Sequence, residues 1–549
     1  MLRNPIGFGA SDFIELALAA LLVAMALISR PWIEPFARRL AVKTGWCILF
    51  LALFPVALRL AMLPSHPVPS PNVYDEFGHL LVADTLLHFR LANPPHPLHQ
   101  FFETFFVLQT PTYASIYPLG QGLALAIGRA VFGLPWAGVV LSTAALCALC
   151  YWMLRAWTTP EWALLGGVLA VLEFGPLSAW MNSYWGGSLA GAAGCLVFGA
   201  LPRLRVANRT RDGVLLGLGL AIHWFIRPYE TIFLALAVLL FFLPAPRPRA
   251  RPALVAVTAL LGAVGLSLLQ NRQITGSWTT LPYMLSRDQY GVPASFTWQA
   301  NPEPHRELTR EQQLQYKMQT SFRAAGPETL RSYLLRLEYR VRFYRFFFLP
   351  PLYVALLFFV PALRQFRFLW VALTLLLFAL GVNFYPFFEV HYLAALTCLF
   401  VLVSVTALDR LSNDVARLII YLCFAHFVFW YSRSFFDHVD SARRVAVHQQ
   451  LAQAPGQQLV FVRYWPQHIF QDEWVYNEAD IDHSRIVWAR DLGSSEDQKM
   501  LHYYPNRIAW LLEPDATPPK LSRYQAAEEP KLAPIQTPPS SPLRFEQVR

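Results

Sequence analysis

The sequence predicts a mainly α-helical, polytopic membrane protein of about twelve spans, with interfacial helices in its first outer loop and a small C-terminal α/β unit. Of its 549 residues, 55% are hydrophobic and only 15% are charged, whereas about a quarter of the residues of a soluble protein are charged. The apolar residues gather in runs of about 15 to 22, the length of helix that crosses a bilayer. These two observations exclude an ordinary soluble enzyme.

Twelve apolar runs are bounded by Arg, Pro and Gly residues. The stretch from 213 to 243 is divided because Pro228 lacks an amide hydrogen and breaks a helix, which also keeps the Arg clusters on either side of the stretch on one face. The predicted spans cover residues 13–29, 45–63, 135–155, 161–178, 185–201, 213–226, 229–243, 252–270, 344–362, 367–383, 387–407 and 412–431.

The net charge of +10 is explained by arginine-rich loops beside the predicted spans, and the positions of these loops indicate the topology of the chain. The short loops that carry clustered arginines all fall on one side when the twelve spans alternate, and such loops are typical of the cytoplasmic face. We therefore expect no nucleic-acid partner, a multi-pass protein of a bacterial inner membrane, and an extracytoplasmic position for residues 64–134, 271–343 and everything after 432. The first run is preceded by the single Arg3 and followed by Arg30, Arg38, Arg39 and Lys43, so it indicates an anchor rather than a signal peptide.

Four domains follow from this reading. Residues 1–44 would form an anchor helix with a basic cytoplasmic loop, and residues 45–431 the membrane domain. Residues 432–514 contain strand-like runs that alternate with helical ones, which predicts an extracytoplasmic α/β appendage. Residues 515–549 are rich in proline and poor in apolar side chains, so we expect a disordered tail.

The six cysteines all lie within apolar runs. This placement offers no disulfide framework. Cys147 and Cys150 have the spacing of a redox motif, but no charged neighbour is present to stabilise a thiolate, so we interpret them as inert.

The first outer loop contains an acidic pair, Asp75-Glu76, at the start of an amphipathic helix that extends to residue 91. One interpretation is that Asp75 caps this helix, because a carboxylate accepts first-turn N–H groups. The other is that the pair carries chemistry. His79 lies four residues after Asp75, hence on the same helical face, and the two could hold a divalent metal.

Polar groups at the same predicted face favour the chemical interpretation, because ionisable side chains at such depth usually mark function. They come from three loops between spans and comprise Asn182, Tyr184, Arg227, Tyr229, Glu230, Glu389 and His391. Two simpler interpretations remain open. Arg227 and Glu230 have the spacing of an ion pair that would close a hairpin, and His391 has the character of an interfacial histidine with satisfied hydrogen bonds.

The order of these features resembles the C-type glycosyltransferases, and more narrowly their bacterial branch related to protein O-mannosyltransferases and lipid A aminoarabinose transferases. The resemblance covers roughly residues 45–430. Its specific part is the acidic pair together with the helix that follows Pro118 and ends in Phe132-Gly133.

The resemblance implies a polyprenyl-phosphate-linked sugar as donor and an acceptor hydroxyl on a lipid, a glycan or a protein. Carried over to this chain, Asp75 would take the proton of that hydroxyl, and Glu76 would raise the pKa of Asp75 or help to hold the acceptor or a metal. Many relatives have a lysine before the proline of the second helix, where this chain has Ile116-Tyr117-Pro118. The cation that neutralises the leaving phosphate must therefore come from elsewhere, and we expect Arg227 first and Arg287 second.

Nothing in the sequence requires a cofactor, although it leaves room for a divalent metal. Asp480-Ile481-Asp482-His483 is similar to the Asp-x-Asp of nucleotide-sugar enzymes, but three-residue matches arise by chance. The alternative function is a transporter or flippase of a lipid-linked saccharide. A transporter should show repeated halves and polar residues near the bilayer midplane, whereas this chain shows no internal repeat and its polar groups gather beyond the helix ends.

Overall fold

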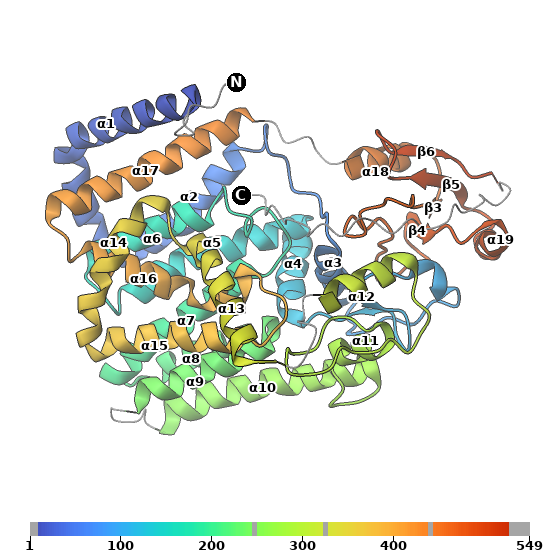
Figure 1. The fold of residues 1–549 in the computed structure, drawn as a ribbon, viewed down its shortest axis with the longest axis horizontal. Helices are drawn as coiled ribbons and strands as arrows, with labels where there is room; N and C mark the ends of the chain where they lie inside the picture. Colours follow the sequence, from blue (N-terminus) through green and yellow to red (C-terminus); the bar gives the residue numbers. More distant parts are fainter. Residues whose placement is uncertain (1–8, 244–249, 322–327, 438–442, 526–549) are drawn as a thin grey trace.

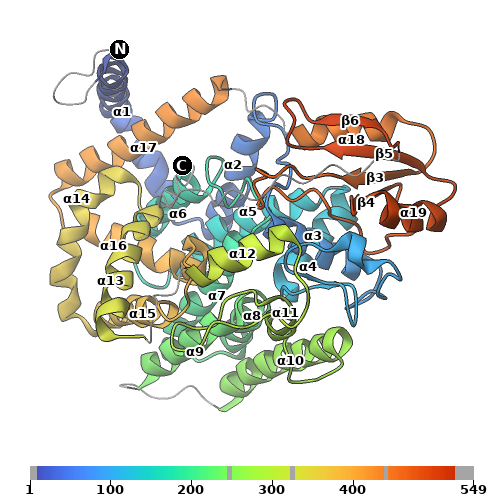
Figure 2. The same cartoon turned by 45° about the vertical axis from the view of Figure 1, so that its right-hand side comes forward.

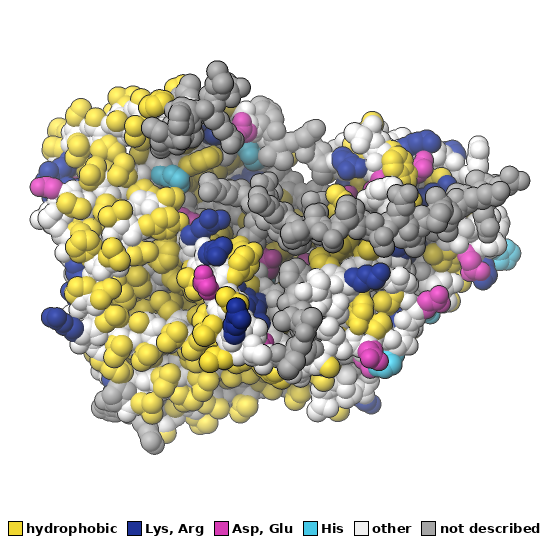
Figure 3. Space-filling model, in the orientation of Figure 1, with side chains coloured by type: hydrophobic (Ala, Val, Ile, Leu, Met, Phe, Trp, Pro, Cys, Tyr) yellow, Lys and Arg dark blue, Asp and Glu magenta, His cyan; other side chains and the backbone are white. Residues whose placement is uncertain are grey.

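A computed structural model describes residues 9–243, 250–321, 328–437 and 443–525. A body of long helices occupies one side of the molecule, and a mixed unit with all the named strands occupies the other (Figure 1). Hydrophobic side chains cover much of the helical body in Figure 3, whereas charged side chains gather over the mixed unit. The structure confirms the predicted fold class, a mainly α-helical polytopic membrane protein.

Each predicted span coincides with a helical segment. The α-helices of the body are α1 (Ala10–Ala41), α2 (Thr44–Ala61), α5 (Pro135–Leu154), α6 (Pro160–Phe174), α7 (Gly187–Val206), α8 (Thr210–Ile226), α9 (Pro228–Phe242), α10 (Ala250–Thr275), α14 (Tyr353–Leu356), α15 (Phe366–Val382), α16 (Thr397–Leu408) and α17 (Asn413–Phe436). Short 3₁₀ segments join them: η2 (Arg342–Phe347), η3 (Pro350–Leu352), η4 (Leu357–Arg364) and η5 (Val390–Leu396).

Fewer of these segments than the predicted twelve can cross a bilayer by length alone. Among the described residues, 7 helices are long and apolar enough, or up to 8 when the bent pair Leu330–Phe347 and Pro350–Arg364 counts as one span. The remaining predicted spans coincide with α6 and α9, of 15 residues each, and with α8 and α15, of 17 residues each. The predicted break at Pro228 is confirmed, since α8 ends at Ile226 and α9 begins at Pro228.

The predicted basic loop after the first span is wrong over most of its length. Helix α1 continues to Ala41 and includes Pro31 and Pro35. Glu34 explains how the charges are accommodated on a helix, because its carboxylate lies 3.2 Å from Arg30 one turn before it and 2.9 Å from Arg417 of α17. The anchor therefore packs along α17 instead of ending in a loop (Figure 1).

The mixed unit is built from the two outer loops and the C-terminal residues. Its helices and strands are α3 (Tyr74–Leu87), η1 (His99–Phe102), β1 (Val107–Leu108), β2 (Ala114–Ser115), α4 (Leu119–Phe132), α11 (Pro282–Tyr290), α12 (Arg310–Ser321), α18 (Arg443–Gln453), β3 (Gln458–Val462), β4 (Ile486–Arg490), α19 (Ser494–Tyr503), β5 (Ile508–Glu513) and β6 (Lys520–Arg523). Helix α13 (Leu330–Val341) lies instead over the helical body (Figure 1).

The C-terminal sheet has the strand order β4-β3-β5-β6. Strand β3 is parallel to β4 and β5, and β6 adds an antiparallel edge. The predicted disordered tail is therefore wrong for Lys520–Arg523, which pairs with Trp510–Glu513, and the rest of the prediction from 526 to 549 lies outside the described residues.

The C-terminal α/β unit is not a separate appendage, because it shares a hydrophobic core with the first outer loop. Leu81 of α3 and Phe101 of η1 are fully buried in the same cluster as Phe461 of β3. Polar contacts join the same parts: the Ala479 N–H donates to Asp84 Oδ2 at 2.6 Å, and Asp84 Oδ1 accepts from Arg129 at 2.9 Å. Figure 2 shows the sheet lying beside α3 and α4.

Candidate active site

The N-terminus of α3 presents Asp75 to the centre of the molecule. Glu76, not Asp75, caps this helix: one of its carboxylate oxygens accepts the N–H groups of Asn72 at 2.8 Å and Val73 at 3.3 Å. The interpretation of Asp75 as a helix cap is therefore wrong. Its carboxylate is left for other contacts.

Glu76 also joins α3 to the loop before α7. Its second oxygen accepts the N–H of Tyr184 at 2.9 Å, and the Tyr184 hydroxyl donates to the Pro69 carbonyl at 2.9 Å. With three backbone N–H donors on one buried carboxylate, Glu76 positions the site. Its negative charge raises the pKa of Asp75, as the sequence predicted, but burial of Asp75 is the larger cause.

Asn182 holds the same loop in place from the other side. Its side-chain oxygen accepts a hydrogen bond of 2.6 Å from the fully buried Arg59 of α2, and its amide donates to the carbonyls of Pro176 at 2.7 Å and Ser178 at 2.9 Å. The whole side chain is engaged, so Asn182 supports the loop rather than facing the site.

Tyr117 is the residue that contacts Asp75 most directly. Its hydroxyl donates a hydrogen bond to Asp75 Oδ1. The phenol can lie over α3 because Gly78 has no side chain there: a Cβ at that position would meet the Tyr117 ring at 2.8 Å. Burial and the neighbouring carboxylate raise the pKa of Tyr117, so the phenol stays protonated and can donate this hydrogen bond.

Burial raises the pKa of the Asp75 carboxyl to about 6. The hydrogen bond from Tyr117 opposes this shift, as does the positive charge of Arg227, whereas Glu76 adds to it. A carboxyl with a pKa near the working pH is suited to take a proton during a reaction. Asp75 thus has the environment of a general base.

His79 lies on the same face of α3, as predicted from its spacing. Its imidazole packs against the Tyr117 ring with 4.4 Å between centroids, and its buried Nδ1 has no hydrogen-bond partner among the described residues. Burial and the charge of Arg227 lower the pKa of His79 to about 3. The ring is therefore neutral, and Nδ1 is available to a ligand.

Arg227 lies at the break between α8 and α9. Its guanidinium lies over the aromatic ring of Tyr392, 4.6 Å from the ring centroid. Within the part of the chain that the structure describes, Arg227 and Glu230 form no ion pair within 4 Å. The structure therefore does not support the interpretation that an ion pair closes this hairpin. The charge of Arg227 still acts on Asp75 and His79.

Glu389 and His391 lie near the same group of charged residues, because both are within electrostatic reach of Arg227. Glu389 precedes η5 and lies within electrostatic reach of both Asp75 and Arg227. His391 is buried against the ring of Trp185, with 5.2 Å between centroids. The buried Trp185 Nε1 has no hydrogen-bond partner among the described residues. Like Nδ1 of His79, it is a polar atom that could bond to a ligand.

Arg287 and Tyr283 approach from α11 in the second outer loop. Burial raises the pKa of Tyr283, whereas the positive charges of Arg287 and Arg227 both lower it, which places this phenol within reach of the two cations. Its buried hydroxyl has no partner among the described residues. Two cations and a free hydroxyl together suit an anion.

Tyr229 does not join this group. Its hydroxyl donates to the Gly381 carbonyl at 2.9 Å, and its ring packs against Phe233 and Phe296. The predicted binding role of Tyr229 therefore has no free polar atom to support it, and the side chain fastens α9 to α15.

A metal site is not evident around Asp75. Among the described residues, no group of three or more His, Cys, Asp or Glu side chains could hold an ion. In the C-terminal α/β unit, Asp480 bonds to His483 at 2.9 Å and Asp482 accepts from Tyr504 at 2.5 Å, so both carboxylates already have protein partners. Cys147 and Cys150 are buried free thiols.

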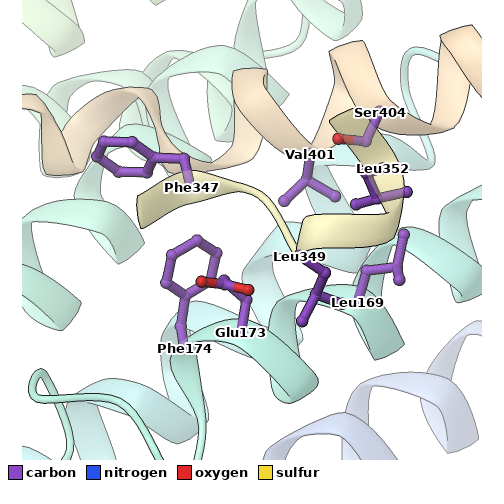
Figure 4. Close-up of a pocket in the computed structure, with 8 residues that line it drawn as sticks. All are labelled: Leu169, Glu173, Phe174, Phe347, Leu349, Leu352, Val401 and Ser404. Atoms are coloured by element: carbon purple, nitrogen blue, oxygen red, sulfur yellow. The ribbon is translucent and has the colours of Figure 1, made fainter. Parts of the chain in front are cut away.

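A small cavity of about 10 Å³ lies within the helical body, apart from this site (Figure 4). None of the residues around Asp75 lines it. Its walls come from α6, α16 and the segment from η2 to η3, and they comprise Leu169, Glu173, Phe174, Phe347, Leu349, Leu352, Val401 and Ser404.

The sequence identified Asp75, Arg227, Glu389 and His391, and the structure brings them together. The sequence did not identify Tyr117, Tyr392, Trp185 or Tyr283 as site residues. For Tyr117 a signal was present, since a tyrosine stands next to the proline where related enzymes carry lysine. The other three are aromatic residues in an aromatic-rich chain, and no pattern distinguishes them.

No family model and no curated protein matches this chain. Among solved structures, it is similar to ArnT from Cupriavidus metallidurans in the apo state, with a TM-score of 0.53 and 12% identity over 86% of this chain and 93% of that one. The same ArnT bound to undecaprenyl phosphate gives a TM-score of 0.52 at 12% identity, with the same coverage.

A weaker likeness is to the oligosaccharyltransferase AglB from Archaeoglobus fulgidus in complex with an inhibitory peptide and a dolichol-phosphate. The TM-score is 0.42 at 12% identity, over 86% of this chain and 69% of that one. The agreement with ArnT extends over nearly the whole of both chains. This protein therefore has the fold of the C-type glycosyltransferases.

Proposed function

We propose that this protein is a membrane glycosyltransferase that moves a sugar from a polyprenyl-phosphate donor to an acceptor hydroxyl on a lipid, a glycan or a protein. The observation that carries the proposal is a partly buried carboxyl, Asp75, within electrostatic reach of a cation, Arg227, at the edge of a helical membrane body. The ArnT-like fold supports it, since one ArnT structure contains undecaprenyl phosphate.

Asp75 is the proposed base. As the acceptor hydroxyl attacks C1 of the sugar, its proton passes to the Asp75 carboxylate, and the bond from C1 to the phosphate oxygen breaks. The pKa of about 6 leaves most of the carboxyl ionised at neutral pH while keeping it basic enough to accept the proton. The Tyr117 hydroxyl holds the carboxylate in position by its hydrogen bond.

Arg227 is the proposed partner of the leaving phosphate. Cleavage leaves negative charge on a lipid phosphate, and a fixed cation in a site of low dielectric stabilises that charge. The Tyr392 ring supports the guanidinium at 4.6 Å, and no carboxylate lies within 4 Å of it among the described residues, so its donors remain available for phosphate oxygens. Arg287 and Tyr283 border the same space.

We further propose that the site faces the exterior of a bacterial inner membrane. The short Arg-rich loops all fall on the opposite side of the predicted topology, as the positive-inside rule requires. A polyprenyl-phosphate donor and its acceptor would then meet at the outer surface of the membrane.

The test is reconstitution of the purified full chain in lipid nanodiscs with a panel of radiolabelled polyprenyl-phosphate sugars and a membrane extract as acceptor. The expected result is release of free polyprenyl phosphate together with label in the acceptor, and neither with the Asp75→Asn variant. Movement of intact donor across proteoliposomes without release of phosphate would instead identify a flippase. Absence of both activities across the panel would reject the proposal.

A further inference from the structure

Helix α13 has an orientation that sets it apart from the spanning helices. The segment Leu330–Phe347, which joins α13 to η2, is bent by 113° from the segment Pro350–Arg364 that follows it. If the second segment crosses the bilayer, the first runs close to parallel with its surface. Such an orientation is that of an interfacial helix.

One face of α13 is held against the loop after α15. The Tyr333 hydroxyl donates to the Leu380 carbonyl at 2.7 Å, and Arg336 donates to the Asn383 carbonyl at 2.9 Å. The buried Arg340 donates to the carbonyls of Val382 at 3.0 Å and Pro386 at 2.8 Å. These contacts fix which face of α13 turns outward.

The outward face carries Arg331, Arg342 and Arg345, which are exposed, together with the exposed carboxylate of Glu338. Residues 331 and 342 are eleven apart and so recur on one side of an α-helix. Residues 342 and 345 are three apart in the 3₁₀ segment η2, where such side chains eclipse each other. Among the described residues, none of the three guanidiniums has an ion pair or a hydrogen bond.

Apolar side chains flank these arginines on both sides. Leu334 is 50% exposed on one flank, and Leu335 and Tyr339 are each 56% exposed on the other. In Figure 3, basic side chains over α13, with acidic ones among them, are bordered by hydrophobic side chains that continue onto the helical body. The face therefore offers guanidiniums with hydrocarbon on either side.

Three other arginines of the second outer loop have protein partners. Arg306 bonds to Glu103, Arg310 to the Pro466 carbonyl, and Arg336 to Glu328 at 2.9 Å. Arginine is unfavoured in loops on the outer side of a membrane. Pairing within the protein therefore does not explain the three on α13 and η2, nor Arg287 of α11.

We propose that α13 and η2 form a binding surface for the headgroups of anionic phospholipids in the outer leaflet. Guanidiniums make paired hydrogen bonds to phosphate oxygens, and the flanking leucines would contact the upper acyl chains. The apolar flanks favour a lipid over a free phosphate, which brings no hydrocarbon. This inference rests on the proposed outward orientation of the site but not on the proposed transfer reaction.

The test uses the full chain in nanodiscs that contain a trace of phosphatidylglycerol with a photoreactive headgroup, followed by mass spectrometry of the crosslinked peptides. The double variant Arg342→Gln/Arg345→Gln is compared with Arg209→Gln/Arg410→Gln, which changes two exposed arginines elsewhere. A phosphatidylcholine probe with the same photoreactive group reports contact without anionic selectivity. Unchanged thermal unfolding midpoints confirm that both variants are folded.

The expected result is crosslinking to residues 328–347 that falls at least about fivefold in the first double variant and is unchanged in the second, a loss in line with removal of charge-assisted hydrogen bonds. Added inorganic phosphate should not compete. Equal labelling by the two probes would reduce the surface to a plain membrane contact and overturn the proposal, as would undiminished labelling of the first variant. Full competition by inorganic phosphate would also overturn it, in favour of a soluble-anion site.

Discussion

Replacing Tyr117 by phenylalanine tests how the environment of Asp75 sets its pKa. The change removes the hydroxyl that donates to Asp75 Oδ1 and leaves the ring that packs against His79. The lost hydrogen bond stabilises only the ionised carboxylate, so its removal raises the pKa of Asp75. If Asp75 is the base, the variant loses activity at low pH and recovers it at high pH.

The size of the shift follows from the energy of the bond. Hydrogen bonds to charged groups contribute about 1.5–3 kcal/mol, and 1.36 kcal/mol corresponds to one pKa unit. Because Asp75 is not fully enclosed, we take the lower end, about one unit, which moves its pKa from about 6 to about 7. The ionised fraction then falls about fivefold at pH 6 and about twofold at pH 7, and hardly changes at pH 8.

The assay is the pH dependence of kcat/KM for sugar transfer in nanodiscs. Wild type should rise with pH through an inflection near 6, and Tyr117→Phe through one near 7, with the two curves meeting at high pH. Tyr283→Phe is the matched control, because the Tyr283 hydroxyl has no protein partner among the described residues; it should leave the inflection unmoved. An unshifted inflection in Tyr117→Phe, with activity lowered equally at every pH, would refute the proposed coupling.

The remaining predictions concern the base, the cation, the capping carboxylate and the orientation. Asp75→Asn should lower transfer at least about 100-fold while the protein stays folded; near-normal transfer would remove Asp75 from the mechanism. Arg227→Lys should weaken use of the donor more than use of the acceptor, and Arg227→Gln should reduce donor use about tenfold or more. Glu230→Gln should be milder, and equal harm from Arg227→Gln and Glu230→Gln would support the ion-pair interpretation instead. Glu76→Gln should destabilise the protein by about 1–3 kcal/mol, measured by thermal unfolding against the exposed control Glu161→Gln; equal midpoints would contradict its capping role. Cysteine labelling at 205 and 365 should report the cytoplasm and at 300 and 480 the exterior, and an exterior result at 205 would overturn the topology.

The membrane body was predictable because its signal is local. A run of apolar residues specifies a helix and its burial in lipid without reference to any other part of the chain, and Pro228 marks a break by its own chemistry. The prediction failed where a local rule was overridden by a contact. Arg30 suggests a loop, but on the helix the carboxylate of Glu34 pairs with both Arg30 and Arg417 and offsets their charge.

The candidate site was predictable only in part. Charged residues at helix ends on one side of a membrane converge for topological reasons, which accounts for Asp75, Arg227 and Glu389. The different roles of Asp75 and Glu76 could not be predicted, since both carboxylates suit a helix N-terminus. Only the positions of the Asn72, Val73 and Tyr184 N–H groups show that Glu76 is the cap.

The shared core between α3 and the C-terminal sheet bears on when the candidate site is completed during synthesis. The hydrogen bond from Ala479 to Asp84 joins residues 395 positions apart, and loops of that length close slowly. The spanning helices can insert one after another as the chain emerges, yet the helix that carries Asp75 acquires its packing partners only when nearly the whole chain has been made and exported. A nascent chain halted at the last span would therefore be anchored in the membrane without a finished site.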